Sequence, residues 1–158
     1  MESDSLYYLL GFSVLGILLI SLIPAIFFLL TLQKTLNAVS PENRSMQPTQ
    51  VWLLLIPVFN IVWIFITVTR IADSIKNECS RLSIPTAESR PTYGIGLVMS
   101  ILWICGIIPV AGMIASLAGL ICWIIYWVKV NDYKNIIISN QDNFLLDIER
   151  ETAQSSSR

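Results

Sequence analysis

Apolar residues occur in three long runs that contain no charged side chain. The runs cover residues 6–32, 51–69 and 91–128, and the 10 basic and 11 acidic residues lie between or outside them. A membrane-spanning helix needs about 20 predominantly apolar residues, and within lipid the backbone polar groups must be satisfied inside the segment. The pattern therefore predicts an all-α, polytopic membrane protein.

The runs predict four transmembrane helices, because the last run is too long for one. The predicted spans are residues 6–32, 51–72, 93–108 and 112–130. A tight turn is expected at Pro109 and Gly112. The second helix is expected to continue past Ala72 as a juxtamembrane amphipathic extension and to stop before Pro85. Residues 1–130 then form a transmembrane domain, and residues 131–158 form a cytoplasmic tail.

Lysine and arginine in the short loops predict the orientation, because cytoplasmic loops are enriched in both. With the N-terminus inside, the external loop 33–50 holds two of these residues, whereas loop 70–92 and the segment after the fourth helix hold six. Both termini are therefore expected in the cytoplasm, with loops 33–50 and 70–92 on opposite sides. An impermeant thiol reagent should then leave Cys79 unlabelled in intact cells.

Composition removes most catalytic chemistry. The chain is 54% hydrophobic and 13% charged, against about 25% charged for an ordinary soluble domain. It has no histidine and three dispersed cysteines, which argues against histidine-based catalysis, a metal site and a bound cofactor. The net charge is −1 and no basic stripe occurs, so nucleic acid is not an expected partner.

The second span contains the most unusual residues. Pro57 and Asn60 indicate a kink or a broken helix. Two interpretations are open: Asn60 bonds to a neighbouring helix at a structural kink, or it lines a conduction path. Trp52 is expected at the outer interface, whereas Trp63 lies well inside the hydrocarbon and should face another helix.

Two helix ends carry the same charged pattern. Arg70 is followed three residues later by Asp73, and Lys129 by Asp132. The simplest interpretation is a snorkelling cation with a local counter-ion, and the alternative is a headgroup or ion site.

Small residues at four-residue spacing indicate close helix packing. Ala115 and Gly119 in the fourth helix match Gly96 and Ser100 in the third.

One stretch resembles a known family. Asn43-Arg44-Ser45-Met46-Gln47-Pro48 is followed by Val51-Trp52-Leu53 and by Ile56-Pro57-Val58-Phe59-Asn60. The stretch resembles an uncharacterised family of small bacterial multi-span membrane proteins with a domain of unknown function. The resemblance implies a bacterial cytoplasmic (inner) membrane location and makes Arg44 the first surface residue to mutate.

The leading functional expectation is a non-catalytic inner-membrane protein surrounded by membrane lipid. It would act by assembly, either as a homo-oligomer or with another membrane protein as a small subunit of a complex. The first alternative is a small oligomeric channel or pore lined by Asn60, Thr67 and Thr69. The second is a lipid-modifying enzyme that uses the four charged residues at the helix ends: Arg70, Asp73, Lys129 and Asp132. The apolar runs 6–32, 51–69 and 91–128 hold no charged residue, which argues against a pump or an ion-coupled transporter.

Overall fold

The computed structural model describes residues 2–106, 108 and 111–156, and it is helical throughout its regular elements. The elements are α1 (Glu2–Ala38), the short 3-10 helices η1 (Pro41–Asn43) and η2 (Pro48–Leu55), α2 (Pro57–Arg81), α3 (Tyr93–Cys105) and α4 (Ala111–Ser156). No strand occurs among these residues, so the predicted all-α class is confirmed.

The chain divides into two compact units, the first ending at Leu30 and the second beginning at Thr31. The first unit is a single stretch of α1 that contains Pro24 without interruption. Large apolar side chains such as Tyr7, Leu10 and Phe12 are exposed along it. The apolar run from residue 6 to residue 32 is therefore one helix, as predicted.

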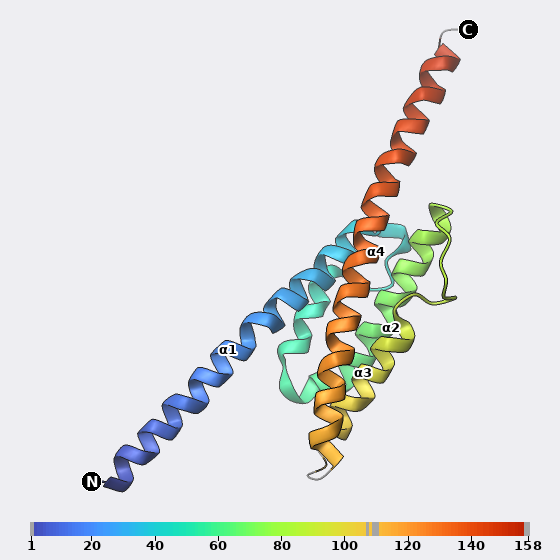
Figure 1. Cartoon of the computed structure of the whole chain (residues 1–158). Coiled ribbons are helices and arrows are strands. Elements are labelled where there is room, and N and C mark those ends of the chain that lie inside the picture. The colour runs from blue at the N-terminus through green and yellow to red at the C-terminus, as the bar shows by residue number, and fades with distance from the viewer. Residues whose placement is uncertain (1, 107, 109–110, 157–158) are drawn as a thin grey trace. The chain divides into compact units, whose positions relative to one another are not determined.

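The second unit packs α2, α3 and α4 side by side (Figure 1). Its core consists of fully buried apolar side chains from these helices and from the end of α1: Leu32, Leu36, Val68, Ile71, Ile75, Met99, Tyr126, Val130 and Ile137. A Cβ built on Gly96 would lie 2.5 Å from Val68 Cγ1 and 2.7 Å from Tyr126 Cε2. Gly96 thus permits close packing of the three helices, and the small-residue prediction is confirmed at this position.

The predicted second span is not one helix. It is divided at Ile56, whose backbone is extended, and α2 begins at Pro57. The Nε1 of Trp63 donates to the carbonyl oxygen of Gln50 at 2.9 Å, whereas thirteen residues of continuous helix would separate them by about 20 Å. Pro57 has no backbone N–H, so the hydrogen bonding of η2 cannot continue through it, and it is well suited to the first position of a new helix. η2 therefore folds back along α2.

This hairpin corrects the predicted position of the 33–50 loop. Ser40 and Asn43 both bond to Glu78, near the C-terminal end of α2. Loop 33–50 and loop 70–92 therefore lie at the same end of the second unit, and the prediction that they lie at opposite ends is wrong. The error arose because hydropathy does not distinguish an apolar hairpin from an apolar span.

The two remaining helices differ in length from their predictions. α3 is short, as expected, and ends at Cys105. α4 does not end at residue 130 but continues to Ser156, so the segment expected as a tail extends the helix. Pro109 and Val110, which were predicted to form the turn, lie outside the described residues.

Two helices in the described part of the chain are long and apolar enough to cross a membrane. They are α2 and the Gly112–Gln154 part of α4, whereas Leu22–Ala38 and α3 are shorter apolar helices. Membrane character is thus supported for two helices, and four spans stay a prediction. The predicted extension of the second helix is confirmed, because α2 runs to Arg81 and stops before Pro85.

Candidate functional site

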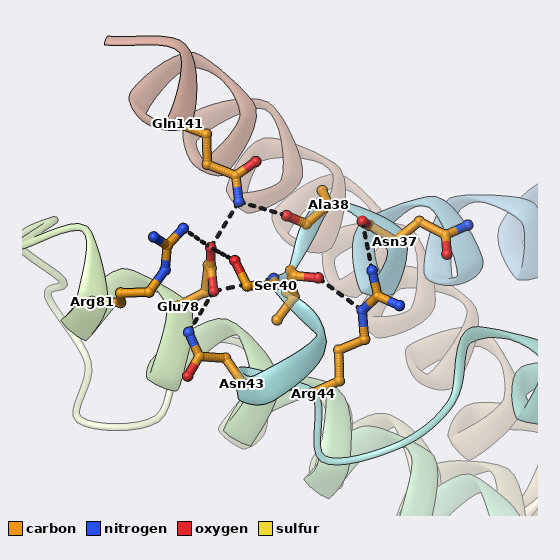
Figure 2. A network of polar contacts seen from close by, with 9 residues as sticks. Asn37, Ala38, Ser40, Asn43, Arg44, Glu78, Arg81 and Gln141 are labelled. Atoms are coloured by element: carbon orange, nitrogen blue, oxygen red, sulfur yellow. Dashed lines mark hydrogen bonds and ion pairs between the residues drawn. The ribbon is translucent and has the colours of Figure 1, made fainter. Parts of the chain in front are cut away.

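Glu78 is the centre of the most extensive polar network in the second unit. Its side chain is fully buried and accepts five hydrogen bonds. Oε1 receives the Ser40 hydroxyl at 2.9 Å, Arg81 Nη2 at 2.6 Å and Gln141 Nε2 at 2.7 Å, and Oε2 receives the Ser40 backbone N–H at 3.2 Å and Asn43 Nδ2 at 2.7 Å. Figure 2 shows these groups converging on the carboxylate from three segments of the chain.

Helix periodicity explains why a carboxylate is buried here. Glu78 lies seven residues after Ile71 and three after Ile75, so all three share one face of α2. Both isoleucines are fully buried, and the helix therefore carries Glu78 into the same interface. There it meets η1, the residues just before it, and α4. Glu78 thus joins elements that are distant in sequence.

The network keeps Glu78 ionised. Burial alone would raise the pKa of this carboxyl, but the hydrogen bonds from Arg81, Asn43, Gln141 and Ser40 together outweigh it and lower the pKa from 4.5 to about 2. Glu78 lies beyond the uncharged part of α2, which ends at Thr69. Because the carboxylate stays charged at neutral pH, it is suited to holding donors in place and not to exchanging protons.

The same network closes the end of α1. The last carbonyl groups of a helix have no partner within it. Here Arg44 Nη2 donates to the Asn37 carbonyl at 3.0 Å, Gln141 Nε2 to the Ala38 carbonyl at 2.9 Å, and Arg44 Nε to the Val39 carbonyl at 2.7 Å. Arg44, which the sequence marked as a candidate, is therefore a structural donor to this helix end.

The four charged candidates do not form the predicted local pairs. Arg70 Nη1 donates to the Ser45 carbonyl at 3.1 Å, and Asp73 instead pairs with Arg90, whose Nη2 lies 2.6 Å from Oδ1. Lys129 pairs with Glu88 and not with Asp132, which is exposed. The predicted i, i+3 ion pairs are therefore wrong, since partners from the 82–92 loop take their places.

The apolar candidates are distributed along η2 and α2. Trp52 Nε1 donates to Gln33 Oε1 at 2.9 Å. Trp63 bonds to the backbone carbonyl of Gln50 in η2 and stacks on Phe59 of its own helix, with ring centroids 5.0 Å apart.

Asn60 and Thr67 both present buried oxygen atoms without a hydrogen-bond partner in the described structure, namely Oδ1 and Oγ1. The predicted bond from the Asn60 side chain to a neighbouring helix is therefore not made at Oδ1.

Two sequence candidates meet in an open pocket of about 610 Å³. Arg44 and Arg70 line it together with Ser45, Met46, Gln47 and Gln50. In the part of the chain that the structure describes, no three histidine, cysteine or acidic side chains gather as metal ligands would. The polar side chains of the pocket carry guanidinium, amide and hydroxyl groups.

The residues that sequence reasoning missed are those of the Glu78 network beyond Arg44: Ser40, Asn43, Glu78, Arg81 and Gln141. A sequence signal existed for Glu78, because its spacing from Ile71 and Ile75 puts a carboxylate in an apolar stripe, and for Arg81, because it follows Glu78 by three residues on α2. Ser40, Asn43 and Gln141 come from other elements and have no such signal.

No family model, curated protein or solved structure matches this chain. The resemblance of the 43–60 stretch to an uncharacterised membrane family thus stays a prediction.

Proposed function

We propose that this chain is a non-catalytic membrane protein that acts by assembly, and that the distal part of α4 is its docking element. The observation that carries the proposal is the continuity of α4. The helix extends from its apolar segment to Ser156, so its last 26 residues project roughly 39 Å beyond Val130 at 1.5 Å per residue.

The base of this projection is fixed and its distal part is uncovered. Gln141 bonds to both Ala38 and Glu78, whereas residues 142–150 are all exposed. The exposed residues include four large apolar side chains, Phe144, Leu145, Leu146 and Ile148. Apolar groups of this size in water favour burial against a partner.

Charge favours a protein partner over the membrane surface. Residues 142–151 carry four acidic residues and one arginine, a net charge of −3. The cytoplasmic leaflet is negatively charged and attracts basic segments. An acidic helix held in line with its own membrane segment is directed away from that surface. The expected partner therefore offers an apolar groove with basic residues at its rim.

The distribution of basic residues supports a cytoplasmic position for this helix. Loops 33–50 and 70–92 and residues 129–134 contain eight lysine and arginine residues: Lys34, Arg44, Arg70, Lys76, Arg81, Arg90, Lys129 and Lys134. The opposite turns, near residues 56 and 106, contain none. The positive-inside tendency then assigns the basic end to the cytoplasm. A single crossing by residues 6–32 would put the N-terminus on the other side, which revises the expectation for that terminus.

Native mass spectrometry of the gently extracted protein tests the docking role. Leu145→Ser with Ile148→Ser should abolish an assembly that the wild type forms. Asn143→Ser is the matched control, because Asn143 is also exposed but lies about 160° around the helix from Leu145. Loss of a second, different chain indicates an accessory subunit, and loss of a defined multimer indicates a homo-oligomer. A wild-type chain that stays a monomer of 17.8 kDa, like both variants, would contradict the proposal.

A second candidate function is a small pore, which rests on the unpartnered oxygens of Asn60 and Thr67. The two residues are seven apart and therefore share one face of α2, as a polar path requires. Ion flux through liposomes should fall at least tenfold in Asn60→Leu and Thr67→Val. Thr69→Val is the control, since its hydroxyl already donates to the Phe65 carbonyl at 2.8 Å. Absence of flux in the wild type would exclude this function.

A further inference from the structure

The pocket between Arg44 and Arg70 has a positive charge that no acidic side chain balances. Its polar lining consists of these two arginines with Ser45, Gln47 and Gln50, and no aspartate or glutamate contributes to it. Arg81, Arg90 and Arg150 each pair with a carboxylate. Among the described ion pairs none involves Arg44 or Arg70, and the pocket is therefore a concentrated site of unneutralised guanidinium charge.

Backbone contacts fix both guanidinium groups without neutralising them. Arg44 uses Nε and Nη2 on the carbonyls of Val39 and Asn37, and Arg70 uses Nη1 on the carbonyl of Ser45. Arg44 Nη1, with Nε and Nη2 of Arg70, makes no hydrogen bond within the described structure. Arginine N–H groups held in this way are pre-organised to bind an oxyanion, since guanidinium geometry matches phosphate oxygens.

The position of the pocket indicates which kind of oxyanion it would bind. Arg70 is the first charged residue after the apolar 51–69 segment, which is the depth at which lipid headgroups begin. Met46 in the pocket wall is nearly fully buried, whereas Leu55, at the far end of η2, and Ile56, directly after it, are exposed. η2 thus leads from the pocket to exposed apolar side chains that can contact the acyl chains of a lipid.

We propose that this pocket binds the phosphate of an anionic membrane lipid, with Arg44 and Arg70 as its ligands. The inference rests on the proposed membrane location, but it is independent of the docking role of α4. Inorganic phosphate presents the same oxyanion chemistry without acyl chains, and it is the alternative source that the experiment must separate.

Retention of phosphatidylglycerol on the extracted protein, measured by native mass spectrometry against phosphatidylcholine, tests the site. Arg70→Gln removes one ligand. Gln50→Glu adds a negative charge to the pocket while keeping the oxygen that accepts the Gln47 backbone N–H at 3.1 Å. Each variant should weaken retention of phosphatidylglycerol about tenfold. Lys76→Gln, at an exposed position on α2 outside the pocket, should leave retention unchanged and controls for general surface charge.

Three results would overturn the proposal. Equal retention in the wild type and both pocket variants would show that the arginines do not hold the lipid. Equal retention of phosphatidylcholine would remove the anionic selectivity. Thermal stabilisation by millimolar inorganic phosphate equal to that by phosphatidylglycerol would assign the site to a free anion. Leu145→Ser should retain lipid as the wild type does, so failure of the docking role and failure of the lipid site are distinguishable.

Discussion

Replacing Glu78 by glutamine tests whether the buried carboxylate holds the second unit together. The substitution keeps the size of the side chain but removes the charge and turns one acceptor oxygen into an amide donor. Glu78 accepts five hydrogen bonds on its two oxygens. In the variant, the amide N–H groups must face at least two of these donors, which then lose their partner inside a buried interface.

The magnitude follows from the pKa. A carboxyl whose pKa falls from 4.5 to about 2 on folding contributes about 3 kcal/mol at neutral pH, since each pKa unit is worth about 1.4 kcal/mol. Removing one partner of a buried ion pair costs about 3–5 kcal/mol, a range that includes the value derived from the pKa. For a chain of this length, about 3 kcal/mol lowers the Tm by roughly 6–12 °C.

The pH dependence gives a second, independent readout. The folded pKa lies below the unfolded one, so the stabilisation is present above about pH 4.5 and is lost as the pH falls toward 2. The Tm difference between wild type and Glu78→Gln should therefore be largest at pH 7 and shrink steadily below pH 4.5. Thermal melts of the detergent-solubilised protein, followed by circular dichroism at pH 7, 4 and 3, measure it.

Asp147→Asn is the matched control for that experiment. It removes a carboxylate from the Arg150 pair, whose side chains are 76% and 72% exposed, and exposed pairs contribute little. Its Tm should lie within about 2 °C of the wild type. The reasoning is refuted if Glu78→Gln melts as close to the wild type as this control does, or if the Tm difference is the same at pH 7 and pH 3.

Three further predictions concern packing, reactivity and topology. Gly96→Ala should cost about 1–3 kcal/mol in unfolding free energy, because its new methyl group would overlap Val68 and Tyr126; Gly94→Ala, which meets nothing within 4 Å, should not. In a Cys105→Ser, Cys122→Ser background, Cys79 should react with maleimide at pH 7 only after unfolding in SDS. Its side chain is 1% exposed, and burial, helped by the charge of Glu78, raises the thiol pKa to about 11. Rapid labelling of the native protein would contradict this. A C-terminal green fluorescent protein fusion should fluoresce, as expected for a cytoplasmic C-terminus. An N-terminal epitope should be accessible to antibody on intact spheroplasts, as expected for an external N-terminus. A non-fluorescent fusion or a protected epitope would reverse the assignment of that terminus.

Burial of Cys79 also changes the value of the labelling test suggested by the sequence. A thiol that is 1% exposed does not react on either side of a membrane, so its protection carries no information about topology. Terminal fusions and epitopes are therefore the more direct measurement.

The features that the sequence predicted correctly are those that depend on residues within a few helical turns. The apolar stripe through Ile71 and Ile75 predicted that α2 continues past the membrane segment, and Pro85 predicted its limit, because both depend on neighbours within a few turns. Gly96 likewise predicted close helix packing. These features follow from periodicity and backbone geometry alone.

Features that depend on long-range packing were not predicted. Proline at position 57 suggested an interruption, but the direction of the chain before it depends on the contact between Gln50 and Trp63. Asp73 had Arg70 three residues away, yet it pairs with Arg90, which the loop before α3 brings closer. For Asp73 and Lys129, the nearest opposite charge in sequence was therefore a poor guide to the partner in space.

Gln141 connects the Glu78 network with the proposed docking helix. Its side-chain amide bonds both the Ala38 carbonyl and Glu78 Oε1, and Phe144, one turn further along, has the Arg81 guanidinium over its ring at 5.6 Å. Loss of the Glu78 charge should therefore release the base of the distal helix while its apolar residues stay intact. Loss of Leu145 and Ile148 should remove the docking surface while the Glu78 network stays intact. If assembly fails only in the second case, docking requires the surface alone; if it fails in both, it also requires the helix to be held in a fixed direction.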